Sequence, residues 1–457
     1  MNRAWAVGGR FIVAASLSLG SPAGAGPGDL EQARPERVRA HVAFLSSEAL
    51  RGRGSATEDE AAAADYVAGQ FAAAGLSHAP GMSGYVDPIS LTRHRQTGPA
   101  VLRAGGRALE GMTLLQATGG VAGGRTGLVR DKAKPLPRAA VLIVTDTGPG
   151  GPSVMARAEA VGAELLIVPE TEQTREMASS GRPSLPIYPR GEAPPRRLAV
   201  VALPAPQLAQ LAATAAEVTL TVPFTAEEAW TRNVIGFLPG RDRGAGVLLL
   251  SAHIDHLGCR RDGTIMPGAN DDASGVAAVI ELARALAAGP RTRRGILFVG
   301  YGSEEIGGFG ARRFAARPPV PLSDLAANIQ FEMIGQQDPK LPTGRLMMTG
   351  FERSTLGTAL QAAGAPIAPD PYPEEGYFER SDNFPLALKG VVAHTVAGWA
   401  GPTYHEPTDT VDKLDLEFMA ETIAGMAASV RTLANSSKAP RWNQSGRPTL
   451  QRGGWND

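Results

Sequence analysis

Apolar runs of strand length flank a helix-like pattern between positions 246 and 305. Residues 247–251 and 296–299 are short apolar runs, which is typical of buried strands. Between them, residues 273–288 carry apolar side chains at helical spacing, and Gly289-Pro290 ends the pattern. Strand, helix and strand in this order predict a βαβ unit, and therefore a parallel sheet.

The same patterns continue on both sides of this unit. They predict helices at 35–50, 58–74, 308–316, 355–363 and 417–433, and buried strands at 328–332 and 390–396. We therefore expect an α/β fold, a three-layer sandwich with a mixed, mostly parallel sheet between helices on both faces.

The segment 98–223 has a different texture. Gly and Pro are frequent there, the strand-like runs at 139–144, 164–168, 198–203 and 218–222 are short, and helix-like patterns occupy 154–161 and 206–215. We interpret it as an inserted, smaller β-rich domain. The alternative is a set of long active-site loops, but structureless loops of this length are uncommon in compact domains.

The ends of the chain differ from its centre. Residues 1–25 combine early arginines, a short apolar stretch and small residues before position 25, which is the pattern of a signal peptide; a disordered tail is the alternative. The protein is thus expected to be exported, periplasmic or secreted, and no later apolar run is long enough to span a membrane. Residues 436–457 are polar and rich in Pro and Gly, which predicts a disordered tail.

Charge and cysteine content limit the possible functions. The 45 basic and 45 acidic residues balance, and no basic block indicates a nucleic-acid partner. Cys259 is the single cysteine, so neither an intrachain disulfide nor a cysteine metal cluster can form. A bound metal would need His, Asp and Glu ligands, which suit zinc, cobalt or manganese. Nothing in the sequence indicates the oligomeric state.

Histidines and carboxylates lie where the predicted strands end. Each has a structural explanation when taken alone: Asp271, for example, precedes a helix and would serve as a cap. Together they are two imidazoles and three carboxylates, enough for two zinc ions if one carboxylate is shared. This candidate ligand set is His253, Asp271, Glu305, Glu332 and His405.

Other polar residues lie beside these candidates. Glu304 remains unassigned as a ligand and is a candidate general base. We expect Asp255 to accept a hydrogen bond from the second ring nitrogen of His253, and Asp409 to do the same for His405. His256 is interpreted as a structural or supporting residue, and His394, in an apolar run, as a core histidine.

Five segments in the same order resemble the secreted co-catalytic dizinc aminopeptidase family, which includes bacterial leucyl aminopeptidases, glutamate carboxypeptidases and transferrin-receptor ectodomains. These segments are SAHIDHLG, PGANDDASGVAAVIELAR, YGSEEIGGFGA, IQFEMIG and TYHEPTDTVDKLD, and a weaker match covers residues 45–71. The resemblance implies a zinc exopeptidase domain formed by 26–97 and 224–435. The insertion at 98–223 resembles a protease-associated domain.

The resemblance also implies roles for the candidate residues. Asp271 would bridge two Zn²⁺ ions, with His253 and Glu332 completing one site and Glu305 and His405 the other. The family often has Asp where this chain has Glu332, and it implies a cis peptide bond between Asp271 and Asp272.

Two further residues follow from a partial match. Asp382 would orient a ligand, although Asn383 stands where the family motif has His. Tyr377 is near the position of a tyrosine that stabilises the oxyanion in some members.

The function implied is an exported dizinc exopeptidase. It would cleave the first peptide bond of substrates with a free N-terminus, using a water between the ions that Glu304 deprotonates. A carboxypeptidase with Arg380 as carboxylate receptor, or a glutaminyl cyclase, remains an alternative with the same fold. A non-catalytic binding ectodomain is a third, although every ligand position is filled here.

Overall fold

The computed structural model describes residues 32–146, 154–180, 183–214 and 217–449. The expected signal peptide, residues 1–25, lies outside these ranges. Among the described residues, no helix combines the length and apolar character needed to cross a bilayer.

One large mixed sheet forms the centre of the protein. Its strand order is β10-β2-β13-β15-β14-β16-β19-β17-β18, with β1 paired to β13. The central four strands are parallel, as the βαβ pattern predicts: β15 (Gly295–Tyr301), β14 (Val247–His253), β16 (Leu325–Glu332) and β19 (Ala393–Ala397). The outer strands are β1 (Ser77–His78), β2 (Val86–Gln96), β10 (Ile187–Pro189), β13 (Phe224–Leu238), β17 (Leu346–Met348) and β18 (Ile367–Pro369).

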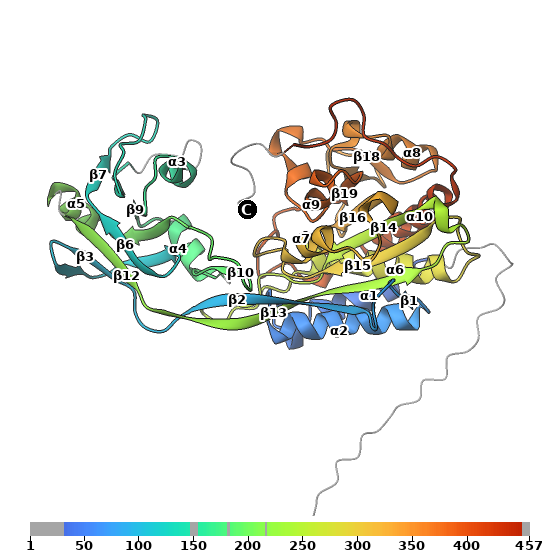
Figure 1. Cartoon of the computed structure of the whole chain (residues 1–457), viewed down its shortest axis with the longest axis horizontal. Helices are drawn as coiled ribbons and strands as arrows, with labels where there is room; N and C mark the ends of the chain where they lie inside the picture. Colours follow the sequence, from blue (N-terminus) through green and yellow to red (C-terminus); the bar gives the residue numbers. More distant parts are fainter. Residues whose placement is uncertain (1–31, 147–153, 181–182, 215–216, 450–457) are drawn as a thin grey trace, which may run out of the picture.

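Helices cover both faces of this sheet, so the three-layer prediction is confirmed (Figure 1). One face packs against α1 (Pro35–Leu45), α2 (Glu58–Ala73), α6 (Gly275–Ala287), α8 (Leu356–Ala362) and α10 (Leu416–Asn435). The other face packs against α7 (Phe309–Ala316) and α9 (Asn383–Leu388).

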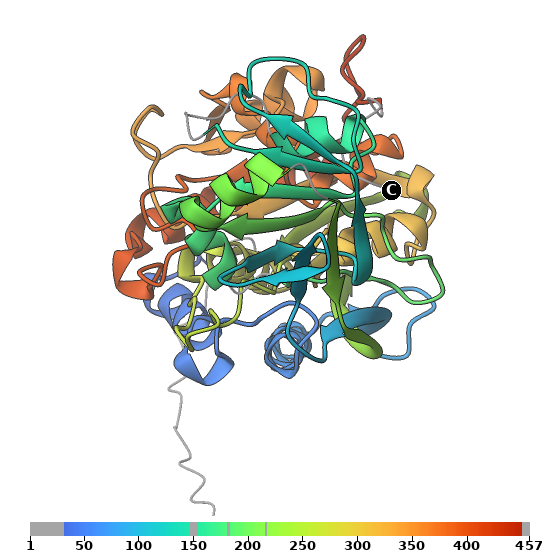
Figure 2. The ribbon, with the colours of Figure 1, turned by 90° about the vertical axis from the view of Figure 1, so that its left-hand side faces the viewer.

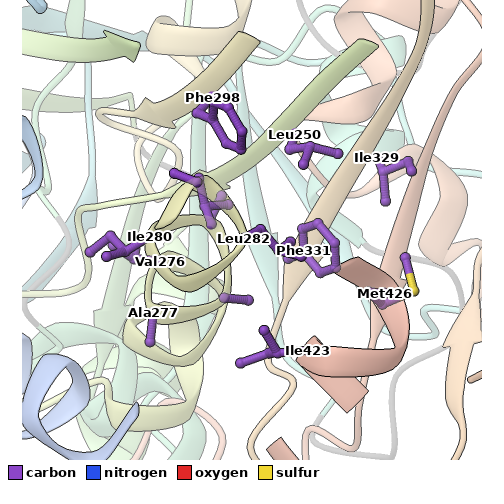
Figure 3. Close-up of a cluster of buried hydrophobic side chains, with 14 of the residues drawn as sticks. Leu250, Val276, Ala277, Ile280, Leu282, Phe298, Ile329, Phe331, Ile423 and Met426 are labelled. Carbon is purple, nitrogen blue, oxygen red and sulfur yellow. The ribbon is translucent and has the colours of Figure 1, made fainter. Parts of the chain in front are cut away.

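The buried centre of the first interface joins strands and helices far apart in sequence. Figure 3 shows Leu250, Phe298 and Phe331 of the sheet facing side chains of α6, with Ile423 and Met426 of α10 closing the cluster. Burying one such side chain contributes about 1.5–3 kcal/mol. The strands that end at the candidate ligands are therefore fixed by a well-packed core.

The chain between β2 and β13 forms two sheets of its own (Figures 1 and 2). The five-stranded sheet contains β5 (Thr113–Gln116), β7 (Thr126–Val129), β8 (Val141–Val144), β9 (Leu165–Pro169) and β11 (Ala199–Leu203). The four-stranded sheet contains β3 (Val101–Ala104), β4 (Arg107–Leu109), β6 (Gly120–Gly124) and β12 (Val218–Val222). Three helices accompany them: α3 (Val154–Ala160), α4 (Glu172–Ser179) and α5 (Ala205–Thr214).

The long antiparallel pair β2 and β13 links this insertion to the central sheet. The two strands are in register from Val86 opposite Val234 to Gln96 opposite Phe224. The sequence patterns did not predict β2, because its side chains are largely charged or half-exposed and it contains Pro88.

The predicted disordered tail is wrong for residues 436–449. The indole Nε1 of Trp442 donates a hydrogen bond to the carbonyl of Gly390 at 3.0 Å, and Asn443 N donates to the carbonyl of Arg353 at 2.8 Å. The polar composition of this segment did not reveal that Trp442 packs against the hydrophobic clusters on both faces of the sheet. Residues 450–457 lie outside the described ranges.

Candidate metal centre

The candidate ligands meet at the carboxyl edge of the four parallel strands. His253 is the last residue of β14, Glu332 is the last residue of β16, and Glu305 follows β15. Asp271 lies on the segment between β14 and α6, and His405 on the loop after β19. Because adjacent parallel strands end at one edge, the topology brings together side chains up to 152 positions apart (253 to 405).

Asp271 lies between two imidazoles. Its Oδ1 is 3.2 Å from Nε2 of His253, and its Oδ2 is 3.1 Å from Nε2 of His405. Nε2 of His405 is also 3.5 Å from Oε1 of Glu305. Glu332 accepts a hydrogen bond from the hydroxyl of Ser381. One carboxylate with a different histidine at each oxygen is the arrangement expected for a shared ligand.

His256 is closer to this cluster than the sequence indicated. It is fully buried, and its Nδ1 lies 2.9 Å from Oε1 of Glu305 and 3.7 Å from Oδ2 of Asp271. Ligand atoms of these three residues lie within 4.8 Å of one another, so they form a possible metal-binding set. The HisIleAspHis spacing was the signal, but it could not show which imidazole faces Glu305.

Buried ring nitrogens in the centre fit a metal site. Within the described residues, Nε2 of the buried His256 has no hydrogen-bond partner, and Nε2 of His253 faces the Asp271 carboxylate at 3.2 Å. Buried polar atoms normally have a partner, and an imidazole nitrogen is a common zinc ligand. The carboxylates of Asp271 and Glu305 supply the hard oxygen donors beside them.

Charges in the cluster perturb one another strongly. Burial raises the pKa of the Glu304 carboxyl well above its usual range, although His253 opposes the shift. Burial likewise raises the pKa of Glu332 to about 7. Burial alone would lower the pKa of His405, but hydrogen bonds to Asp271 and Glu305 outweigh it and raise that pKa to about 9. Such a concentration of buried carboxylates favours bound cations.

Asp255 supports the centre in a different way from the one predicted. Nδ1 of His253 lies 3.2 Å from the backbone carbonyl of Asp255, whereas its distance to the carboxylate is 3.9 Å. The carboxylate instead accepts hydrogen bonds from Ser55 Oγ (2.6 Å), Glu304 N (2.9 Å) and Glu305 N (3.2 Å). Asp255 therefore holds the backbone that presents Glu304 and Glu305.

The prediction for Asp409 is also corrected. Its carboxylate accepts hydrogen bonds from the backbone N–H groups of Asn270 (2.9 Å) and Asp271 (3.1 Å), and no hydrogen bond to His405 is found among the described residues. Asp409 thus fixes the segment that carries Asp271. Asp382 is buried, and its carboxylate oxygens have no hydrogen-bond partner within the described ranges. Tyr377 lines a pocket that also contains Glu332.

Arg53 is an important supporting residue that the sequence analysis did not single out. Its side chain is 1% exposed, and its guanidinium donates to five backbone carbonyls. These acceptors are Leu45 (2.7 Å), Ile254 (2.9 Å), Pro267 (2.7 Å), Gly268 (2.9 Å) and Asp271 (3.4 Å). The signal was present in the weakly matching segment 45–71, but nothing in it showed that this arginine is buried.

Asp272 was predicted only as the neighbour of Asp271. Its carboxylate accepts hydrogen bonds from the backbone N–H groups of His253 (3.2 Å), Gly275 (3.1 Å) and Met333 (3.0 Å), which ties together the three segments that carry His253, Asp271 and Glu332. Gly275 is required for this approach, because a Cβ there would lie 2.4 Å from the Asp272 carboxylate.

The backbone of the centre is unusual. The peptide bond between Asp271 and Asp272 is cis, as the family resemblance implies. Ser303, Met333 and His405 have positive φ angles of 57°, 49° and 57°. Non-glycine residues seldom adopt this conformation, and it is concentrated at functional sites, where the surrounding structure holds it in place.

Comparison with known proteins points to one family. Residues 233–430 match the model of Peptidase family M28. The probable lipoprotein aminopeptidase LpqL of Mycobacterium tuberculosis is 26% identical over 235 residues, which cover 43% of this chain and 44% of that protein. The chain therefore aligns with less than half the length of this curated relative.

Two solved structures share the fold. The aminopeptidase from Aneurinibacillus sp. strain AM-1 superposes with a TM-score of 0.60 and 20% identity, covering 92% of this chain and 97% of that one. A zinc aminopeptidase from Bacillus subtilis gives a TM-score of 0.57 and 19% identity, with coverages of 87% and 94%. The ordered motifs and the matched region agree: residues 233–430 match the model of Peptidase family M28, and the two solved structures share the three-layer fold.

Proposed function

We propose that this protein is a zinc-dependent aminopeptidase that hydrolyses the first peptide bond of peptides with a free N-terminus. The observation that carries the proposal is the position of Asp271, with His253 at one carboxylate oxygen and His405 at the other. The names of the relatives support it, since they are aminopeptidases and the Bacillus subtilis structure is called a zinc enzyme.

We assign two Zn²⁺ ions to each chain, and Co²⁺ or Mn²⁺ would suit the same donors. Asp271 would be shared, with His253 and Glu332 holding one ion and Glu305 and His405 the other. When bound, the ions would polarise the scissile carbonyl and lower the pKa of water. His256 would orient Glu305 through its 2.9 Å contact.

Glu304 is the general base of this proposal. Asp255 holds its backbone N–H at 2.9 Å, so the carboxylate is presented from a fixed main chain. Burial raises the pKa of Glu304, which brings its basicity closer to that needed near neutral pH. Glu304 would take a proton from the attacking water and deliver it to the leaving amine.

Two more residues act on the substrate side of the centre. Tyr377 would donate its hydroxyl to the developing oxyanion, because it lines the same pocket as Glu332. Asp382 would help to orient the site: burial raises the pKa of its carboxyl well above the usual range, and the charge of Glu332 adds to this shift. The substrate's α-ammonium group would be attracted by this cluster of carboxylates.

The chain would be exported and processed after residue 25. A relative described as a lipoprotein aminopeptidase is compatible with export. We further propose that 26–97 and 224–435 form the peptidase domain and that 98–223 is the protease-associated-like insertion. A cavity of about 570 Å³ is lined by Gln116 and Arg197 of the insertion together with Glu305 and His405, so the insertion would border the path of the leaving peptide.

The experiment compares leucine p-nitroanilide with its N-acetylated form, using zinc-loaded protein. We expect cleavage of the free-amine substrate only, and its loss on chelation. Glu304→Gln should retain zinc and lose about 10²–10⁴-fold in kcat, whereas Glu421→Gln, on the exposed side of α10, should behave like the wild type.

Three results would contradict this proposal. Full activity of Glu304→Gln would remove Glu304 as the base. Cleavage of the acetylated substrate would remove the requirement for a free amine. Cleavage of C-terminal residues from acidic dipeptides alone would favour the carboxypeptidase alternative.

A further inference from the structure

A second, smaller cavity adjoins the candidate centre on the side of Glu332. Its volume is about 280 Å³, and Met333, Met347 and Trp399 contribute apolar walls. Ala397 pairs with Glu332 on one side and with Met347 on the other. The cavity therefore extends across two strand spacings, about 10 Å, and it is large enough for one amino-acid side chain.

Asp338 is one of the residues that line this cavity. Asp338 is fully buried, and its Oδ1 accepts hydrogen bonds from Lys340 N (2.8 Å) and from the hydroxyl of Tyr372 (3.1 Å). Its Oδ2 has no hydrogen-bond partner among the residues that the structure describes. A buried acid with one unmatched oxygen is costly on its own, and a nearby cation would offset that cost.

Two cationic side chains near Asp338 are poorly placed to offset this cost. Arg380 also lines the cavity, but it is exposed and its guanidinium lies 5.1 Å from the ring centroid of Tyr377. Lys340 is exposed, with its ammonium 3.9 Å from the ring centroid of Tyr372. Water and salt screen such exposed charges, whereas the field of the buried Asp338 carboxylate is weakly screened.

The loop that covers the cavity adds negative charge. Between 370 and 380 it carries four carboxylates against one guanidinium: Asp370, Glu374, Glu375 and Glu379, with Arg380. This loop supplies Tyr372 and Tyr377 to the cavity wall. The surroundings of the pocket are thus acidic at the rim as well as at Asp338, and favour a cationic occupant.

Two of the cavities that border the centre differ in size, and this difference indicates which part of the substrate each would hold. The cavity bordered by Glu305, His405 and the insertion is about twice as large, 570 Å³ against 280 Å³. An exopeptidase holds a single residue on the amine side and a chain of variable length on the other. The smaller cavity therefore suits the N-terminal side chain of the substrate.

We propose that Asp338 makes this enzyme selective for peptides that begin with lysine or arginine. The apolar walls would hold the aliphatic stem of the side chain, and the carboxylate would attract its terminal cation. This inference rests on the proposed aminopeptidase function and names its preferred substrates.

The test uses two substrates with the same carbon chain, lysine p-nitroanilide and norleucine p-nitroanilide, which differ in the terminal ammonium group. With the zinc-loaded wild type, we expect kcat/KM to favour lysine by about 10-fold or more, the usual effect of a charged hydrogen-bond partner. Asp338→Asn keeps an acceptor for Tyr372 and should reduce that preference to about 2-fold or less. Glu352→Gln removes one exposed negative charge and should preserve the preference.

Each outcome decides between the two proposals. A wild type that cleaves norleucine at least as well as lysine overturns the role of Asp338, even if Asp338→Asn does not fold. An unchanged preference in folded Asp338→Asn overturns it as well. If the wild type cleaves no anilide, the proposed function fails. Calorimetric binding of lysinamide and norleucinamide to the zinc-loaded protein then tests the pocket, and equal affinities would refute it.

Discussion

Arg53 offers the sharpest test of how the centre is held together. Its guanidinium joins three segments: the end of α1, the residue after β14, and the 267–271 loop that carries Asp271. We expect Arg53→Lys to keep the positive charge but to lose the planar fork of donors. A lysine ammonium has three N–H groups, so at least two of the five carbonyls would lose their donor.

The magnitude follows from those contacts. A buried acceptor without a donor costs about 1–2 kcal/mol, so Arg53→Lys should lower the free energy of unfolding by about 2–4 kcal/mol. In a domain of this size that change lowers the unfolding temperature by roughly 5–10 °C. Because Asp271 is on the affected loop, zinc affinity should fall as well.

The assay is thermal unfolding of metal-free protein, followed by zinc titration of the folded variants. Arg51→Lys is the matched control, since the Arg51 side chain is 64% exposed and its Nε is 3.8 Å from Asp59. Such surface changes are usually worth less than about 0.5 kcal/mol. Equal unfolding temperatures for Arg53→Lys and Arg51→Lys would show that the five hydrogen bonds do not stabilise the fold.

Two further predictions concern histidines. Burial lowers the pKa of His394 to about 4. As the pH falls, His394 is protonated in the unfolded chain before it is protonated in the folded one, so the free energy of unfolding should fall between about pH 6.5 and pH 4. Between pH 7 and pH 5, the free energy of unfolding measured with urea in the presence of a chelator should fall by about 2 kcal/mol less for His394→Gln than for the wild type. An equal fall in both proteins would contradict this prediction. His405→Ala should retain about one zinc per chain, because its ring faces both Asp271 and Glu305. His256→Ala should retain two zinc ions per chain. Equal zinc contents of the two variants after dialysis would contradict the choice of His405, rather than His256, as the zinc ligand.

The meeting of three of the candidate residues was predictable because each follows a recognisable apolar run. His253 and Glu332 are the last residues of β14 and β16, and Glu305 comes soon after β15. Parallel strands end at one edge, so the order of the runs already implied a shared site. The core histidine was predictable for the same reason, and His394 is hydrogen-bonded to Ser354 and Thr349 inside the fold.

The supporting contacts were not predictable, and two of the proposed ones were wrong. Asp255 was assigned to His253 from their spacing, yet its carboxylate accepts from Ser55, 200 positions away, and from the backbone of Glu304. Asp409 was assigned to His405 in the same way and instead holds the amide of Asp271. Sequence spacing shows that two residues are close along the chain, whereas a hydrogen bond also requires that the donor and acceptor groups point toward each other.

The sequence by itself determined the layers of the fold, the parallel strands and the types of polar residue at their ends, because these depend on local periodicity and on which residue follows each strand. The tertiary structure decided which groups touch. It turned Arg53 inward, brought His256 to Glu305 and buried Asp338 beside an apolar pocket. These features depend on side-chain direction and on the packing of segments that are far apart in the sequence, such as Arg53 and Ile254 at 201 positions, which no local pattern contains.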